Sequence, residues 1–67
     1  MIDLTVNGDS QRVASGMTLG GLLDDLQVNR QQVAVEVNAE IVPRELHATH
    51  QLAEGDRIEI VTLVGGG

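Results

Sequence analysis

The lack of cysteine in a chain of only 67 residues is the feature that most constrains its fold. A domain of this length buries about 60% of the surface that its unfolded chain exposes, and many small domains need disulfides or a metal for stability. Without a thiol, disulfides, cysteine-bound zinc and thiolate catalysis are excluded. The apolar residues make up 42% of the chain and include no Phe, Trp or Tyr. We therefore expect one compact core shared by a sheet and a helix.

Alternating apolar and polar residues predict the sheet. Ile2, Leu4 and Val6 alternate with polar residues, which is the period of a half-buried strand. Asn7 and Gly8 follow, and this pair favours a hairpin because both residues tolerate positive φ. The strands expected from such alternation are 2–6, 11–14, 33–37, 41–42 and 57–64.

One amphipathic helix is predicted after the hairpin. Thr18 is an N-cap residue, and apolar residues then recur at the spacing of one helix face over roughly ten residues. These apolar residues are Leu19, Leu22, Leu23 and Leu26. Gly20 and Gly21 in the first turn each cost about 1 kcal/mol relative to Ala. We interpret them as a sign that the start of the helix packs closely against the sheet.

The order of these elements predicts an α+β domain in which one helix covers one face of a single sheet. Residues 44–50 are expected to be weakly helical or irregular. The predicted core consists of Leu4, Val6, Val13, Leu19, Leu22, Leu23, Leu26, Val35, Val37, Ile41, Leu52, Ile58 and Ile60.

The last predicted strand runs directly into Gly65, Gly66 and Gly67. Three extended glycines span about 10 Å and carry no Cβ, so they could pass a channel too narrow for other residues. Their terminal carboxylate could then meet a phosphate and become an acyl donor after activation, for instance as an acyl-adenylate. The alternatives are a frayed terminus or the remnant of an expression vector.

The strand before the glycines is apolar on both faces near its end. Ile58 and Ile60 alternate with charged residues, but Val61, Leu63 and Val64 break the alternation. One interpretation is a central strand covered on both faces, or a bulge. The other is an exposed apolar patch that docks a partner beside the glycines.

The formal net charge of −6 argues against binding to nucleic acid or to anionic membranes, because both attract clustered Lys and Arg. It favours a partner with a basic surface. No apolar run reaches the roughly 20 residues of a membrane span, and the first residues resemble a strand rather than a signal sequence. We expect a cytoplasmic protein.

The histidines and aspartates do not predict a metal site. His47 and His50 lie three residues apart, but two imidazoles without a carboxylate or thiol nearby make a poor zinc site, and we expect both to be exposed to solvent. Asp9, Asp24 and Asp25 are interpreted as a solvated surface rather than a magnesium site.

Five stretches of the chain are considered together: the hairpin start, residues 17–19 (Met-Thr-Leu), residues 35–44 (Val-Glu-Val-Asn-Ala-Glu-Ile-Val-Pro-Arg), residues 54–60 (Glu-Gly-Asp-Arg-Ile-Glu-Ile) and the glycine end. In this combination they resemble the ThiS family, the small sulfur carriers of thiamine biosynthesis. The resemblance covers the whole chain in order.

The resemblance implies a ubiquitin-like β-grasp fold over residues 1–64, with a mixed sheet of four to five strands on one helix and a flexible glycine tail over residues 65–67. The first and last strands would lie side by side at the centre of the sheet.

The chemistry that the resemblance implies falls on Gly67. A ThiF-type adenylyltransferase would use ATP and magnesium to adenylate its carboxylate, and a sulfur donor system would convert the adenylate into a thiocarboxylate. A ThiG-type thiazole synthase would accept the sulfur. The chain would be a co-substrate with no catalytic residue and no bound cofactor of its own. Gly65 and Gly66 would enter the partner's active site with Gly67, beside docking residues Val61, Leu63 and Val64.

Two other functions stay open from the sequence. One is a carrier like the small subunit of molybdopterin synthase, although the lack of Phe and Tyr is unusual for that class. The other is a ubiquitin-like interaction module without sulfur chemistry.

Overall fold

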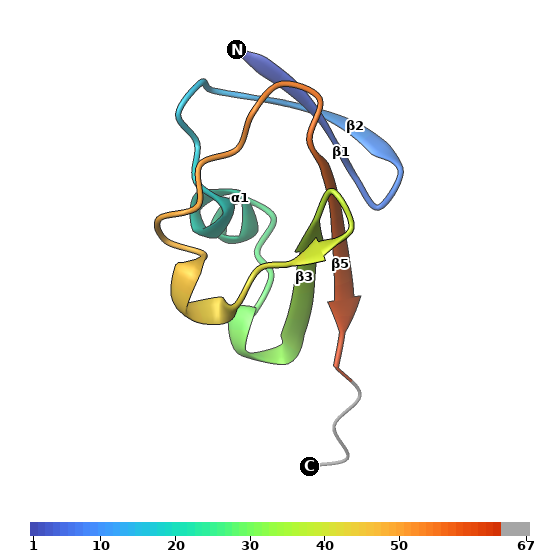
Figure 1. The fold of residues 1–67 in the computed structure, drawn as a ribbon, viewed down its shortest axis with the longest axis vertical. Helices are drawn as coiled ribbons and strands as arrows, with labels where there is room; N and C mark the ends of the chain where they lie inside the picture. The colour runs from blue at the N-terminus through green and yellow to red at the C-terminus, as the bar shows by residue number, and fades with distance from the viewer. Residues whose placement is uncertain (64–67) are drawn as a thin grey trace.

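Residues 1–63, which the computed structural model describes, form five strands, one α-helix and two short 3-10 helices (Figure 1). Val64, Gly65, Gly66 and Gly67 lie outside the described residues. The elements are β1 (Ile2–Val6), β2 (Asp9–Val13), α1 (Leu19–Asp25), η1 (Arg30–Gln32), β3 (Val33–Val37), β4 (Glu40–Ile41), η2 (Arg44–Leu46) and β5 (Arg57–Thr62).

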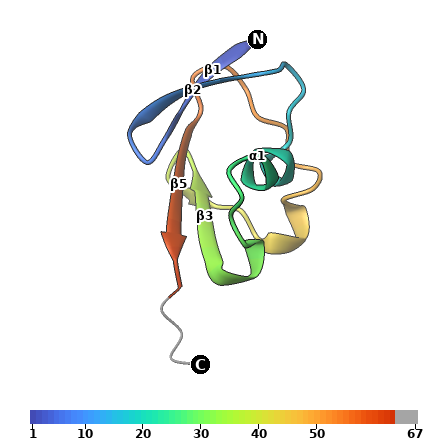
Figure 2. The ribbon, with the colours of Figure 1, turned by 180° about the vertical axis from the view of Figure 1, so that it is seen from behind.

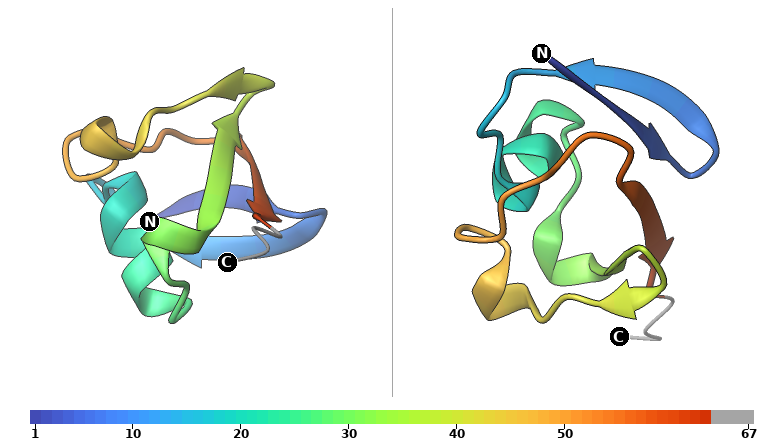
Figure 3. Two further views of the ribbon diagram at one scale, coloured as in Figure 1. Left: turned by 90° about the horizontal axis from the view of Figure 1, so that it is seen from below. Right: turned by 45° about the horizontal axis from the view of Figure 1, so that its top comes forward.

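The five strands form one mixed sheet in the order β2-β1-β5-β3-β4. β1 and β5, the first and last strands of the described chain, are parallel neighbours, and the other pairs are antiparallel. β5 therefore occupies the centre of the sheet. The twisted sheet curves around α1, which lies on one side of it (Figures 2 and 3). This arrangement confirms the expected α+β architecture, including the adjacent first and last strands.

Two tight turns join the hairpins. Asn7 and Gly8 have φ values of 49° and 86°, and Asn38 and Ala39 have 53° and 69°. Positive φ at both central residues is the geometry whose twist matches that of the flanking strands. Because the first turn holds only two residues, β2 begins at Asp9 and not at residue 11 as the alternation predicted.

The helix begins as predicted and ends early. Thr18 Oγ1 accepts a hydrogen bond from Gly21 N–H at 3.1 Å, which confirms the N-cap. The helix spans seven residues instead of about ten, and Gln27 beyond it has a φ of 60°. Close packing at Gly20 is also found, but its partner is the segment after η2 rather than the sheet. Gly20 N–H donates to the carbonyl oxygen of His47 at 2.7 Å.

The core lies between α1 and the sheet and contains most of the predicted residues. Leu26 and Ile60 are only partly buried at its margin. The buried residues are Leu4, Val6, Val13, Leu19, Leu22, Leu23, Val35, Val37, Val42, Leu52 and Ile58.

Two predictions about burial were wrong. Ile41 is 66% exposed, because it pairs with Glu36 on the sheet face that points away from α1, and its neighbour Val42 is buried instead. His47 was expected in solvent but is only 1% exposed. The start of α1 covers its backbone, and its Nε2 lies 3.0 Å from the carbonyl oxygen of Val42. Within the described chain its Nδ1 has no partner.

Candidate functional site

The candidate site is the end of β5, where the described chain approaches the terminal glycines. β3 pairs with β5 as far as Val33 opposite Thr62, and Leu63 N–H then donates to the carbonyl oxygen of Gln32 at 2.8 Å. β5 is thus held in the sheet up to the last described residue. The sequence-predicted residues Val64, Gly65, Gly66 and Gly67 lie beyond it, outside the described part.

Val61 and Leu63, two of the predicted docking residues, lie at this end and are exposed. Val61 is 56% exposed and Leu63 is 54% exposed. On the opposite face of the same strand Ile58 is fully buried. Of the two interpretations of the two-sided apolar strand, coverage on both faces is wrong: β5 is central in the sheet, but its last described residues carry exposed apolar side chains on one face. No helix of residues 1–63 covers that face. The exposed apolar patch of the other interpretation is present, and its docking role stays a prediction.

Around Val61 the strand register brings further residues to the sheet face that points away from α1. We call this the outer face. Ala34 lies opposite Val61, and Glu36 lies opposite both Glu59 and Ile41. The outer face therefore combines apolar side chains with two carboxylates set directly across from each other. Like charges in this position destabilise a sheet, so the pair gains nothing for the isolated domain.

Two turn asparagines hold β5 from its sides. At the start of the strand, Asn38 Oδ1 accepts from Arg57 N–H at 3.0 Å, and Asn38 Nδ2 donates to Asp56 Oδ1 at 2.9 Å. Further along, Asn7 Oδ1 accepts from Ile60 N–H at 2.7 Å, and Asn7 Nδ2 donates to the carbonyl oxygen of Ile60 at 3.2 Å. The sequence predicts Asn7 as a turn residue. It does not predict the side-chain contacts of Asn7 and Asn38 with β5 and the residue before it, because these contacts join residues far apart in the chain.

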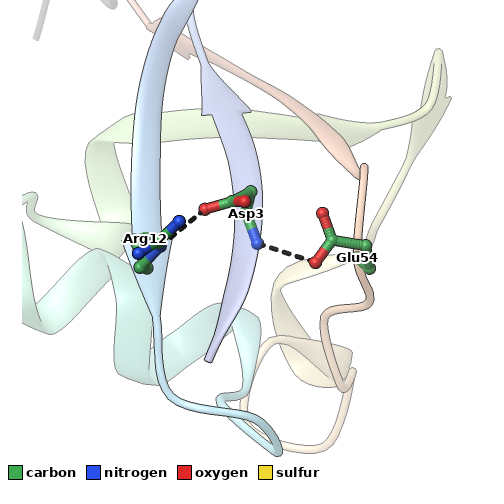
Figure 4. A network of polar contacts seen from close by, with 3 residues as sticks. All are labelled: Asp3, Arg12 and Glu54. Carbon is green, nitrogen blue, oxygen red and sulfur yellow. Dashed lines mark hydrogen bonds and ion pairs between the residues drawn. The ribbon is translucent and has the colours of Figure 1, made fainter.

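A third polar network lies along β1 (Figure 4). Arg12 Nε donates to Asp3 Oδ1 at 2.9 Å, and Asp3 N–H donates to Glu54 Oε1 at 3.1 Å. The hydrogen bond from Arg12, together with its positive charge, lowers the pKa of the Asp3 carboxyl. These contacts join β1 to β2 and to the turn that precedes β5, so their role is structural.

The described residues offer little else for chemistry. Within residues 1–63, no three His, Cys, Asp or Glu side chains are arranged to hold a metal ion. His47, one of the two histidines weighed as a ligand, is buried. No helix in this part of the chain is both long and apolar enough to cross a bilayer.

Comparisons of the sequence and of the structure with known proteins both point to the same family. The sequence model of the ThiS family matches residues 4–67. The chain is 32% identical to the sulfur carrier protein ThiS of Escherichia coli K12 over 66 residues, which cover 98% of this chain and 100% of that protein. It is 42% identical over 64 residues to a thiazole synthase of Paramagnetospirillum magneticum, covering 96% of this chain but 20% of that protein. The chain therefore spans about a fifth of that synthase's length.

The crystal structure of the thiamine biosynthesis protein ThiS from Geobacter metallireducens superimposes with a TM-score of 0.85 at 35% identity. The match covers 98% of this chain and 100% of that one. Together with the single helix on a five-stranded mixed sheet, it confirms the β-grasp fold.

Proposed function

The chain belongs to the ThiS family, and on this premise we propose that the carboxylate of Gly67 is the group that carries sulfur in thiamine biosynthesis. A member of this family is a sulfur carrier and not itself a catalyst. The observation that carries the proposal is the extent of the family match, which runs through the terminal glycines.

The chemistry follows from the weakness of a carboxylate as an acyl donor. An oxygen of the Gly67 carboxylate attacks the α-phosphorus of ATP, a C–O–P linkage forms and pyrophosphate leaves. A donor that supplies sulfur at the level of hydrosulfide then adds to the acyl carbon, and AMP leaves with the oxygen. The product is a thiocarboxylate at Gly67. ATP and magnesium belong to the adenylating partner, and this chain supplies the carboxylate and a path without side chains over Gly65, Gly66 and Gly67.

Three partners follow from this sequence of steps. They are a ThiF-type adenylyltransferase, a sulfur donor system, and a ThiG-type thiazole synthase that takes the sulfur. The similarity to part of a thiazole synthase supports the last of these partners. In that protein, a region similar to nearly the whole of this chain is joined covalently to the rest of the synthase. Since adenylation consumes ATP, we expect the reaction in the cytoplasm.

The adenylating partner is expected to dock on the end of β5. Val61 and Leu63 supply exposed apolar surface there, and Val64 continues it in the sequence. A net charge of −6 favours a basic partner surface and speeds association through electrostatic steering.

Intact-mass spectrometry tests the proposed function. The full chain is incubated with the purified adenylating partner, ATP, magnesium and a sulfur donor, and the expected product is heavier by the exchange of one oxygen for sulfur. Fragmentation should place the change on Gly67. A chain whose Gly67 carboxylate is amidated is the matched control and should stay unmodified. Deletion of Gly67 should also prevent loading; because the shortened chain still ends in a carboxylate on Gly66, its loading would show that the reactive carboxylate need not belong to Gly67. Sulfur loading of the amidated chain would refute the assignment to the terminal carboxylate, and covalent attachment to lysines of other proteins would favour a ubiquitin-like tag.

Gly66→Val is a second test of the path that the tail must follow. A β-branched side chain restricts the backbone and widens the tail. We expect it to impair adenylation strongly and to leave the unfolding temperature unchanged. Normal loading of this variant would show that the partner's channel admits side chains.

A further inference from the structure

β5 loses one of its two neighbouring strands before it ends. β1 pairs with it only at Thr5 opposite Arg57 and at Val6 opposite Ile58, and the chain then turns away at Asn7 toward β2. On the other side β3 stays paired to Thr62. The part of β5 that leads to the docking residues therefore has strand support on one side only.

The side chain of Asn7 takes the place of the missing strand. Asn7 N–H donates to the carbonyl oxygen of Ile58 at 2.9 Å, which is the last backbone contact from β1. Its side-chain amide then bonds both the N–H and the carbonyl oxygen of Ile60, at 2.7 and 3.2 Å. A primary amide offers the same kinds of donor and acceptor as a peptide group. The side chain of Asn7 therefore extends the row of hydrogen bonds between the β1 side and β5 by one further step.

The residue type at this position is constrained twice. The turn requires a φ of 49°, which glycine tolerates best and asparagine tolerates better than most other residues. Glycine, however, would leave both backbone groups of Ile60 to solvent. Asparagine satisfies the turn and the strand together.

We propose that Asn7 is a positioning residue for the loading of Gly67. By holding Ile60, it fixes the backbone directly before Val61 and so presents Val61 and Leu63 to the adenylating partner in one arrangement. Residues that are already ordered cost less affinity when they dock, because less conformational freedom is lost on binding. This role rests on the proposed function, and it predicts an effect on binding of the partner rather than on the chemical step.

Asn38 provides a matched control within the same strand. It also occupies the first position of a two-residue turn, with a φ of 53°. Its side chain also makes two hydrogen bonds, to Arg57 N–H at the start of β5 and to Asp56. Loss of either asparagine side chain thus removes two contacts, but only Asn7 acts next to the docking residues.

The experiment compares Asn7→Gly with Asn38→Gly in the full chain, since glycine is compatible with both turns. Amide hydrogen exchange measured by NMR should show faster exchange at Ile60 in Asn7→Gly alone. Adenylation, followed by pyrophosphate release with purified partner, should show a KM for the carrier raised about three- to tenfold in Asn7→Gly with kcat within about twofold, as expected for the loss of one or two exposed hydrogen bonds. Asn38→Gly should keep KM within about twofold of the wild-type value, even if it lowers the unfolding temperature by as much as Asn7→Gly does.

Asn7→Asp adds a conservative variant that keeps the acceptor for Ile60 N–H and loses the donor to its carbonyl oxygen. Its KM should fall between those of the wild type and Asn7→Gly. An unchanged KM in Asn7→Gly despite faster exchange at Ile60 would overturn the proposal, as would an equal rise of KM in Asn38→Gly. A wild-type chain that the partner binds but never adenylates would overturn the proposed function, and this role of Asn7 with it.

Discussion

Replacement of Gly20 by alanine tests whether close packing, rather than helix propensity, decides the residue at the start of α1. A Cβ built on Gly20 would lie 3.2 Å from the carbonyl oxygen of His47, 3.3 Å from Cα of Ala48 and 2.7 Å from Nη1 of Arg30. The arginine end can move away. The two backbone atoms cannot, because Gly20 N–H also donates to the His47 carbonyl at 2.7 Å and ties the segment to the helix.

The expected effect of Gly20→Ala is the difference between two opposing contributions. Alanine gains about 1 kcal/mol of helix propensity over glycine. Forcing a methyl group into a filled space costs about 1–3 kcal/mol, and stretching the hydrogen bond to His47 costs about 1 kcal/mol more. The net loss in the free energy of unfolding is about 1–3 kcal/mol. In a domain of this size that corresponds to an unfolding temperature lower by about 5–25 °C.

Gly21→Ala is the matched control one residue further on. Its Cβ would lie 2.9 Å from Sδ of Met17 and 3.3 Å from Oγ1 of Thr18. Because the thioether is the far end of a flexible side chain, it can rotate away at little cost. Gly21→Ala should keep part of the propensity gain and change stability by less than about 1 kcal/mol in either direction.

Both variants are measured by thermal and urea unfolding followed by far-UV circular dichroism, since the chain has no aromatic residue for fluorescence. Equal stability of Gly20→Ala and Gly21→Ala would refute the packing argument. A gain of stability in Gly20→Ala would show that the segment after η2 moves freely relative to α1.

Three further substitutions test other parts of the structure. Ala39→Gly should stabilise the domain by about 0.5–1 kcal/mol in urea unfolding, because Ala39 has a φ of 69° that glycine adopts without strain; a loss of stability would contradict this. Glu59→Lys should place an opposite charge across from Glu36 and stabilise the sheet by about 0.2–1 kcal/mol at low salt; a gain that persists at high salt would exclude an electrostatic cause. Asp3→Asn should weaken the acid sensitivity of folding, since the contact with Arg12 lowers the pKa of Asp3 and so contributes stability above the ordinary aspartate pKa of about 3.9 that is lost as pH falls through the lower folded value. Wild-type acid sensitivity in that variant, measured by urea unfolding across this range, would refute the attribution.

The parts of the fold that the sequence predicts well are those with a local signal. The alternation in β1 and β3, the Asn7–Gly8 turn and the Thr18 cap each depend on residues close together in the chain. Where an element is too short to show a period, the prediction fails. β4 has two residues, so nothing in the sequence decided whether Ile41 or its neighbour Val42 faces the core, and the register with β3 decides it.

The same distinction applies to the candidate site, in which some features have a local signal and others do not. Its terminal glycines can be recognised in the sequence because three glycines follow one another at positions 65–67. The contacts that hold β5 are not, because Asn7 and Ile60 lie 53 residues apart and meet only once β1 and β5 are neighbours. His47 shows the same limit: no apolar pattern surrounds it, and it is buried because the start of α1 folds over its segment.

The motif that carries the family resemblance has a structural explanation in its asparagine and aspartate. Asn38 bonds Asp56 and the first residue of β5, and Asp56 Oδ2 accepts from Ala53 N–H at 2.8 Å, so these side chains hold the loop that leads into the central strand. They report the fold, which many functions can share. The proposed sulfur chemistry is assigned to the carboxylate of Gly67, and the reactivity of a carboxylate requires none of these contacts. Losing the Asn38 side chain should therefore lower stability and spare loading, whereas amidating the Gly67 carboxylate should spare stability and abolish loading. The two properties separate along the chain because a carrier needs a rigid body to be recognised and a terminus without side chains to be modified.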